Sequence, residues 1–130
     1  MRPCFVFGSN LAGRHGRGAA LFAREHYGAR LGEGVGRTGN AYAIPTKDGD
    51  LRVLTLPCIH GYVKQFIQYA TANPDMRFNV TRVGCGHAGY EDGQIAPLFA
   101  GAPENCQLPP GWRAIIKSTS IPRKKRVNET

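Results

Sequence analysis

The sequence predicts a single α/β domain, and three observations support that prediction. The chain has 130 residues, a length at which one domain can bury a real hydrophobic core. Twice, a short apolar strand runs into a glycine-rich loop that precedes a helix, first over residues 5–27 and again over residues 78–99. Between these two units lies a long segment with apolar residues at helical spacing. Strands that alternate with helices in this way are typical of an α/β fold.

The first unit begins with the apolar run Phe5–Phe7, and Gly8, Ser9 and Asn10 end that strand. A short amphipathic helix is predicted over Ala19–Tyr27. The glycines between the strand and the helix leave backbone N–H groups unblocked and direct the helix N-terminus toward whatever lies above it. This geometry suits a phosphate or another anion. A tight turn without a ligand is the alternative interpretation.

Two familiar phosphate-binding motifs are excluded by the residues at the helix entry. Gly13 and Gly18 have the spacing of a P-loop, but Ala19 and Ala20 replace its lysine and its hydroxyl residue. The dinucleotide-binding pattern GxGxxG fails as well, because Leu21 stands in place of its last glycine. What remains is a generic cradle for a phosphate.

The rest of the chain alternates between loops, strands and helices. In order, the predicted elements are a loop over Leu31–Asn40, a strand over Ala41–Ile44 closed by Pro45, a short strand or extended segment over Leu51–Leu54, a helix from Thr55 or Leu56 to about Ala72, a strand over Phe78–Val83, a helix over Asp92–Phe99, an irregular segment over Gly101–Pro110 and a last strand over Trp112–Ile116. Thr46 and Lys47 directly follow the second strand, where side chains of an α/β sheet point into a ligand crevice. On position alone, Lys47 is nevertheless a surface lysine.

A second glycine-rich loop covers Gly84–Tyr90, and it again follows a strand and precedes a helix. Two such loops at neighbouring strand ends can hold a diphosphate from both sides. The repetition of the pattern favours a ligand site over the alternative, which is that both loops are tight turns.

The formal net charge is +8, and basic residues gather near the C-terminus. From Arg113 onward the chain has six basic residues and a single acid, Glu129. In one interpretation this segment contacts nucleic acid. In the other, which we favour, it is a solvated tail that keeps the protein soluble.

Several classes of protein and site are disfavoured by composition. No apolar run approaches the roughly 20 residues that span a membrane, and no signal peptide follows Arg2, so we expect a cytoplasmic protein without a membrane partner. The four cysteines lie far apart and form no CxxC pair. We therefore expect no disulfide, no metal site and no cofactor.

Taken together, these motifs resemble a macro domain. The likeness covers roughly Phe5–Phe99 and rests on Gly8-Ser9-Asn10 after the first strand, the glycine-rich helix entry, Ile44-Pro45-Thr46-Lys47 at a strand end, the long helix and Val83-Gly84-Cys85-Gly86. The chain is most similar to the branch that contains the terminal ADP-ribose glycohydrolases and the DarG antitoxins. Its shortness is typical of a reduced, phage-encoded version, which places it in the host cytoplasm. The resemblance implies a compact macro-like domain over residues 1–116, with a mixed sheet sandwiched between helices, and a flexible basic tail over residues 117–130.

The resemblance also implies an ADP-ribose site. Asn10 would contact the distal ribose, and Tyr90 would close over the ribose. Lys47 falls on the lysine that serves as the nucleophile in this branch. The implied ligand-binding residues are Gly8, Ser9, Asn10, Gly16, Gly18, Ala19, Thr46, Gly84, Cys85, Gly86, His87, Ala88, Gly89 and Tyr90.

The chemistry implied for Lys47 requires a second group. A neutral amine can attack the anomeric carbon of ADP-ribose and form a Schiff-base-type adduct that water later releases, while an acid assists the leaving group. Ala88 stands where the glycohydrolases have a partner aspartate, and Ala20 stands where the other branch of the family has its own. The acid is then His87 or Asp48, or the chain is not catalytic. His87 is equally well explained as a ring packed against its loop.

The leading functional hypothesis is an enzyme that binds ADP-ribose or ADP-ribosyl groups and hydrolyses ADP-ribose off a modified macromolecule, either DNA or protein. The alternative is a non-catalytic module that reads or sequesters ADP-ribose-type or NAD-derived nucleotide signals. A nucleic-acid-binding protein that acts through the basic tail is a third possibility. The missing acids favour the module, and the Thr46-Lys47 pair favours the enzyme.

Overall fold

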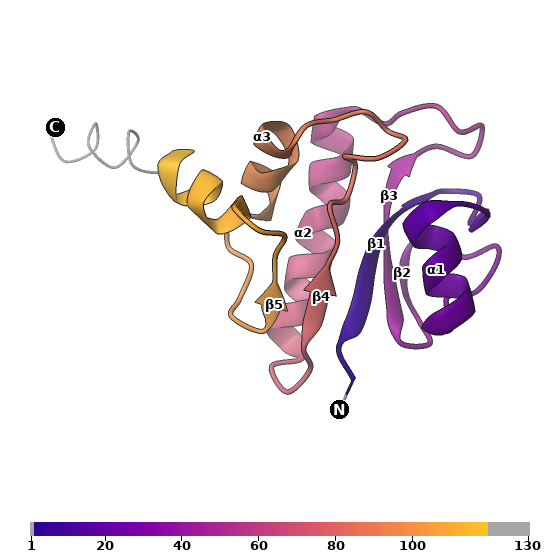
Figure 1. Ribbon diagram of the computed structural model, residues 1–130, viewed down its shortest axis with the longest axis horizontal. Coiled ribbons are helices and arrows are strands. Elements are labelled where there is room, and N and C mark those ends of the chain that lie inside the picture. The colour runs from indigo at the N-terminus through magenta and orange to yellow at the C-terminus, as the bar shows by residue number, and fades with distance from the viewer. Residues whose placement is uncertain (1, 120–130) are drawn as a thin grey trace, which may run out of the picture.

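The computed structural model describes residues 2–119 (Figure 1). The elements follow in the order β1 (Cys4–Asn10), α1 (Gly18–His26), β2 (Gly36–Thr38), β3 (Ala41–Lys47), α2 (Leu56–Ala72), β4 (Phe78–Val80), α3 (Asp92–Ile95), the 3-10 helix η1 (Ala96–Phe99) and β5 (Cys106–Gln107). Residues 112–119 form a further helix. The predicted basic tail lies outside the described residues except for its first three, which belong to this helix.

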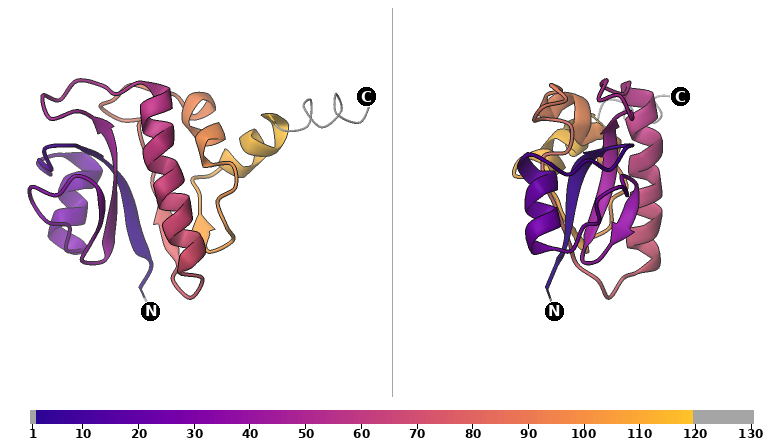
Figure 2. Two further views of the ribbon diagram at one scale, coloured as in Figure 1. Left: turned by 180° about the vertical axis from the view of Figure 1, so that it is seen from behind. Right: turned by 90° about the vertical axis from the view of Figure 1, so that its right-hand side faces the viewer.

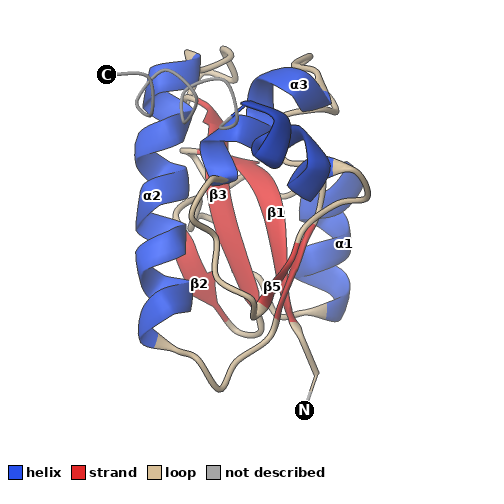
Figure 3. Cartoon of the chain, turned by 90° about the vertical axis from the view of Figure 1, so that its left-hand side faces the viewer, coloured by secondary structure: helices blue, strands red, loops and turns tan. Residues whose placement is uncertain are grey.

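The five strands form one mixed sheet in the order β2-β3-β1-β4-β5. Neighbouring strands are parallel except β2, which pairs with β3 in the antiparallel direction. Helix α1 covers one face of the sheet, and α2 covers the other together with α3 (Figures 2 and 3). The prediction of a single α/β domain with a mixed sheet between helices is confirmed.

The alternating side chains of β1 divide the interior into two cores. Cys4 and Val6 pack in the larger core with α2, α3 and the C-terminal helix, whereas Phe5 and Phe7 pack in the smaller core with α1. This alternation follows from the two-residue period of a strand. The parallel strands β1, β3 and β4 therefore lie between two packed layers. The loops that follow these three strands gather at the edge of the sheet where the strands end.

Helix α2 agrees with its prediction at both ends. The Thr55 side chain accepts a hydrogen bond from the Cys58 N–H, and Pro57 lies in the first turn, where its missing N–H costs nothing. The helix buries Ile59, Val63, Phe66 and Ala70. This spacing is the apolar stripe of a helix that packs on a sheet.

Two corrections concern the segment before α2. The strand predicted to stop at Ile44 continues through Pro45 to Lys47. Pro45 is tolerated because the pairing of β2 with β3 ends at the Gly36–Ala43 pair, so no ladder hydrogen bond on that side is lost. The loop predicted over Leu31–Asn40 contains β2, a three-residue edge strand. Backbone pairing alone forms such a strand, and its glycine-rich sequence carries no apolar pattern.

Three further corrections concern the C-terminal part. The strand predicted over Phe78–Val83 ends at Val80, and the irregular segment predicted over Gly101–Pro110 contains β5. The strand predicted over Trp112–Ile116 is wrong, because residues 112–119 are helical. Trp112 is fully buried and Ile115 and Ile116 are partly buried, which is the i, i+3, i+4 spacing of a helix. The helix predicted over Asp92–Phe99 is confirmed as α3 followed by η1.

Candidate functional site

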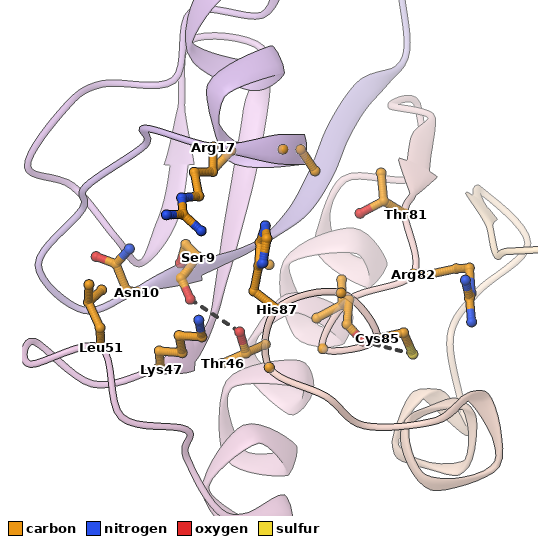
Figure 4. Close-up of a pocket in the computed structure, with 18 of the residues that line it drawn as sticks. Ser9, Asn10, Arg17, Thr46, Lys47, Leu51, Thr81, Arg82, Cys85 and His87 are labelled. Atoms are coloured by element: carbon orange, nitrogen blue, oxygen red, sulfur yellow. Dashed lines mark hydrogen bonds between the residues drawn. The ribbon is translucent and has the colours of Figure 1, made fainter.

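A cavity of about 640 Å³ opens at the carboxyl ends of β1 and β3, between the glycine-rich loop before α1 and the loop after β4 (Figure 4). This placement at parallel strand ends is the one the sequence predicted. Of the predicted site residues, thirteen line the cavity: Gly8, Ser9, Asn10, Gly16, Gly18, Ala19, Thr46, Lys47, Gly84, Cys85, Gly86, His87 and Ala88. Gly89 and Tyr90 do not line it.

An irregularity in the pairing of β1 and β3 brings Asn10 beside Lys47. Ser9 pairs with Pro45, but Asn10 pairs with Lys47, so Thr46 is an extra residue on β3. The Thr46 hydroxyl donates a hydrogen bond of 3.3 Å to the Ser9 carbonyl, which closes the irregularity. The backbone of Lys47 is thus fixed by its pairing in the sheet. Figure 4 shows the Lys47 side chain in the cavity beneath Ser9.

The loop between β1 and α1 is held by its own side chains. The Asn10 amide donates to the Arg14 carbonyl and accepts from the Arg14 N–H, both at 3.0 Å. The resemblance implies that Asn10 contacts the distal ribose; in the structure its amide also fixes this loop. One amide hydrogen and one oxygen lone pair of Asn10 remain for a ligand.

The segment over residues 30–36 packs closely against the loop between β1 and α1. Ser9 donates its hydroxyl to the Gly34 carbonyl, and His15, which is fully buried, places Nε2 at 3.1 Å from the Glu33 carbonyl. A Cβ at Gly34 would collide with the Asn10 carbonyl, and a Cβ at Gly13 would collide with the Glu33 N–H. Glycine is required at both positions by this close approach of two backbones.

The glycines that face the cavity differ from those that the fold requires. A Cβ at Gly16 or at Gly86 would meet no protein atom within 4 Å, and neither residue has a positive φ. By contrast, Gly84 has φ +77° and its Cβ would lie 3.0 Å from Ile95. Protein packing therefore explains the glycine at 84 but not those at 16 and 86, where the missing side chains leave room on two sides of the cavity.

The second loop contributes lining residues whose backbone N–H groups are unpaired. Within residues 2–119, the N–H groups of Gly86, His87 and Ala88 donate no hydrogen bond. Helix α1 presents its N-terminus from the opposite side, and Arg17 at its N-cap position makes no side-chain cap. Successive free N–H groups and a helix N-terminus both attract anions.

The cationic side chains of the cavity were largely missed by the sequence prediction. Arg14, Arg17 and Lys47 line it, and within residues 2–119 their side chains form no ion pair and no hydrogen bond. No aspartate or glutamate lines the cavity. The signal that could have identified them is the presence of two arginines and no acidic residue in the glycine-rich loop over residues 11–18. The other lining residues missed are Ala20, Leu51, Thr81, Arg82 and Val83.

Arg82 differs from the other cations because Asp92 holds it. Its guanidinium donates two hydrogen bonds of 3.0 Å to the Asp92 carboxylate, which also accepts one of 2.7 Å from Trp112 Nε1. Arg82 and then Trp112 lower the pKa of the Asp92 carboxyl below its usual value. Burial raises the pKa of the adjacent Cys85 thiol. This cluster ties the loop after β4 to the C-terminal helix.

Tyr90 has a structural role in the described chain. Its hydroxyl donates a hydrogen bond of 2.6 Å to the Leu54 carbonyl, and its ring packs against the larger core. It therefore joins the second loop to the segment that follows β3. The resemblance implies that Tyr90 closes over the ribose, and in the structure Tyr90 does not line the cavity.

Of the two acids left open by the sequence, one reaches the cavity. His87 lines it and is exposed (Figure 4). The Asp48 carboxylate accepts hydrogen bonds of 2.8 Å and 2.9 Å from the N–H groups of Asp50 and Arg52, and Asp48 does not line the cavity. Ala20 and Ala88 do line it, so methyl groups lie at the two positions where the resemblance would place an aspartate.

Among residues 2–119, no three histidine, cysteine or acidic side chains gather as a metal site would require. In the same residues, no helix is long and apolar enough to cross a membrane.

No protein-family model matches the chain, and no curated protein or solved structure matches it. The functional argument therefore depends on the cavity itself.

Proposed function

We propose that this cavity binds ADP-ribose or an ADP-ribosyl group, as in a macro-like domain, and that the protein hydrolyses ADP-ribose off a modified macromolecule, either DNA or protein, in the cytoplasm. The observation that carries the proposal is the charge of the cavity. Arg14, Arg17 and Lys47 line it without a carboxylate among the lining residues, and the N-terminus of α1 and residues 86–88, whose backbone N–H groups are free, line it as well. A volume of about 640 Å³ lies within the range of nucleotide-sized pockets.

The diphosphate fits between the two glycine-rich loops. The N-terminus of α1 and the Arg17 guanidinium lie on one side, and the N–H groups of residues 86–88 lie on the other. Charge-assisted hydrogen bonds from backbone groups of this kind are among the strong ones in proteins. The distal ribose then extends toward Asn10 and Lys47, which the pairing irregularity places side by side.

The proposed reaction uses Lys47 as the nucleophile. Its neutral amine attacks the anomeric carbon, a nitrogen–carbon bond forms and the bond from that carbon to the acceptor atom of the macromolecule breaks. His87 supplies the proton that the leaving group takes up. Opening of the ribose ring converts the adduct to a protonated Schiff base, and water hydrolyses it to free ADP-ribose and the lysine amine.

A second function is favoured by one observation, the methyl groups of Ala20 and Ala88 at the two positions of the family's acids. A cavity that binds the diphosphate without a carboxylate suits a module that reads or sequesters ADP-ribose-type nucleotide signals. The two functions share the binding site and differ in turnover.

Titration calorimetry with ADP-ribose tests the binding, and release of ADP-ribose from modified DNA and modified protein tests the reaction. In an enzyme, Lys47→Ala abolishes release and Lys47→Arg does not restore it, because an arginine stays protonated. Borohydride then traps a covalent adduct in the parent protein but not in either variant. In a binding module, Lys47→Arg keeps most of the affinity and the parent has no turnover. Turnover that persists in Lys47→Ala contradicts the lysine mechanism, and a parent protein that does not bind ADP-ribose contradicts the whole proposal.

A further inference from the structure

Leu51 combines three properties that are unusual for a leucine. It lines the cavity, its side chain is 46% exposed, and its φ is +66°. Within residues 2–119, every other residue with a positive φ is a glycine. A branched apolar residue in the left-handed region is strained, and such strain persists only where the surroundings impose it. Glycine or asparagine is the usual residue for that conformation.

The turn around Leu51 is tightly hydrogen-bonded. The Asp48 carboxylate accepts from the N–H groups of Asp50 and Arg52, and the Leu51 N–H donates to the Asp48 carbonyl at 3.1 Å. At its base, Val53 forms an antiparallel bridge with Lys47. The turn thus begins directly after the candidate nucleophile, and Figure 4 shows the direction of the Leu51 side chain.

That direction is toward the cavity. In Figure 4, Leu51 lies next to Asn10 and Lys47, on the side opposite Arg82 and Cys85. The residues beside it are polar, so Leu51 is the apolar surface at this end of the cavity. An exposed apolar side chain next to an amine nucleophile is suited to pack against an apolar C–H face of a ligand and to exclude water there.

We infer that Leu51 is a specificity-determining contact that packs on the distal ribose of the ligand beside Lys47. This inference rests on the proposed function, because the distal ribose is placed there only if the diphosphate lies between the two loops. Leu51 then distinguishes ADP-ribose from ADP, which has the same diphosphate but no distal ribose.

The test compares the two ligands in four proteins by titration calorimetry: the parent, Leu51→Gly, Leu51→Ala and Val53→Ala. Removing the leucine side chain weakens ADP-ribose binding about tenfold, as expected for the loss of a partly buried apolar contact, and leaves ADP binding within about twofold of the parent. Val53 is the matched control, because it is equally exposed at 46%, belongs to the same turn and does not line the cavity. Val53→Ala leaves both affinities unchanged.

Thermal unfolding of the same proteins checks the strain. Leu51→Gly melts at a higher temperature than Leu51→Ala, because both lose the side chain but only glycine accepts the positive φ without cost. Equal affinity of the parent and Leu51→Gly for ADP-ribose, or an equal loss for ADP-ribose and ADP, overturns the inference while the proposed function stands. A parent protein that binds neither ligand overturns the proposed function, and the inference falls with it.

Discussion

The substitution Gly86→Val tests the position of the diphosphate with little effect on the fold. A Cβ at Gly86 meets no protein atom within 4 Å, and the φ of Gly86 is not positive. The change in the free energy of unfolding should therefore stay within about 1 kcal/mol. In the cavity, however, the valine methyl groups occupy the space through which the N–H groups of residues 86–88 reach a phosphate. A hydrogen bond to a charged group contributes about 1.5–3 kcal/mol, so the loss of one weakens ADP-ribose binding by roughly 10- to 150-fold.

The assay pairs calorimetry with thermal unfolding, and Gly61→Val is the matched control. Gly61 is exposed on α2, its Cβ also meets no protein atom within 4 Å, and it does not line the cavity. Gly61→Val should bind ADP-ribose as the parent does. If Gly86→Val is folded and binds ADP-ribose within twofold of the parent, the diphosphate does not lie against the second loop and the site assignment is wrong.

Three further predictions concern the missing acid and the cysteines. Ala88→Asp should raise the rate of ADP-ribose release and weaken ADP-ribose binding, because it adds an acid and a negative charge to the cavity; an unchanged rate in a release assay would contradict the need for a carboxylate. Burial raises the pKa of the Cys4 and Cys106 thiols to about 11, so a thiol reagent should label the exposed Cys58 first and these two only after unfolding. Because these thiols keep their protons in the folded state and lose them near pH 9 when unfolded, stability to urea should fall as the pH rises from about 9 to 11.

The parts of the fold that could be predicted are those in which side-chain pattern and structure coincide. Helix α2 has a capping threonine, an early proline and an apolar stripe, and its predicted bounds agree with the structure. Strands β2 and β5 could not be predicted, because edge strands of two or three residues form through backbone pairing that leaves no apolar signature. The helix at residues 112–119 could not be distinguished from a strand, because a segment of five residues with four apolar ones fits either period.

The location of the candidate site could be predicted from the sequence, but the arrangement of several of its side chains could not. Its glycines and its location follow from the rule that loops at the carboxyl ends of parallel strands form the ligand crevice. The extra residue Thr46, which aligns Asn10 with Lys47, depends on the pairing of two strands more than thirty residues apart and has no local signal. The same holds for Leu51, whose positive φ becomes visible only in the structure.

The electrostatics of the cavity affect binding and turnover in opposite directions. In the proposed site, we expect Arg14, Arg17 and the N-terminus of α1 to stabilise a diphosphate in the ground state and in the transition state alike, which increases affinity without accelerating the reaction. Cleavage at the anomeric carbon develops positive charge on the ribose, which a carboxylate stabilises and a cationic lining does not. Because Ala20 and Ala88 stand where the resemblance implies an acid, we expect slow release of ADP-ribose if the proposed enzyme is correct. The sequestering module is the case in which release is absent, so the measured rate of release and the measured affinity decide between the two proposed functions.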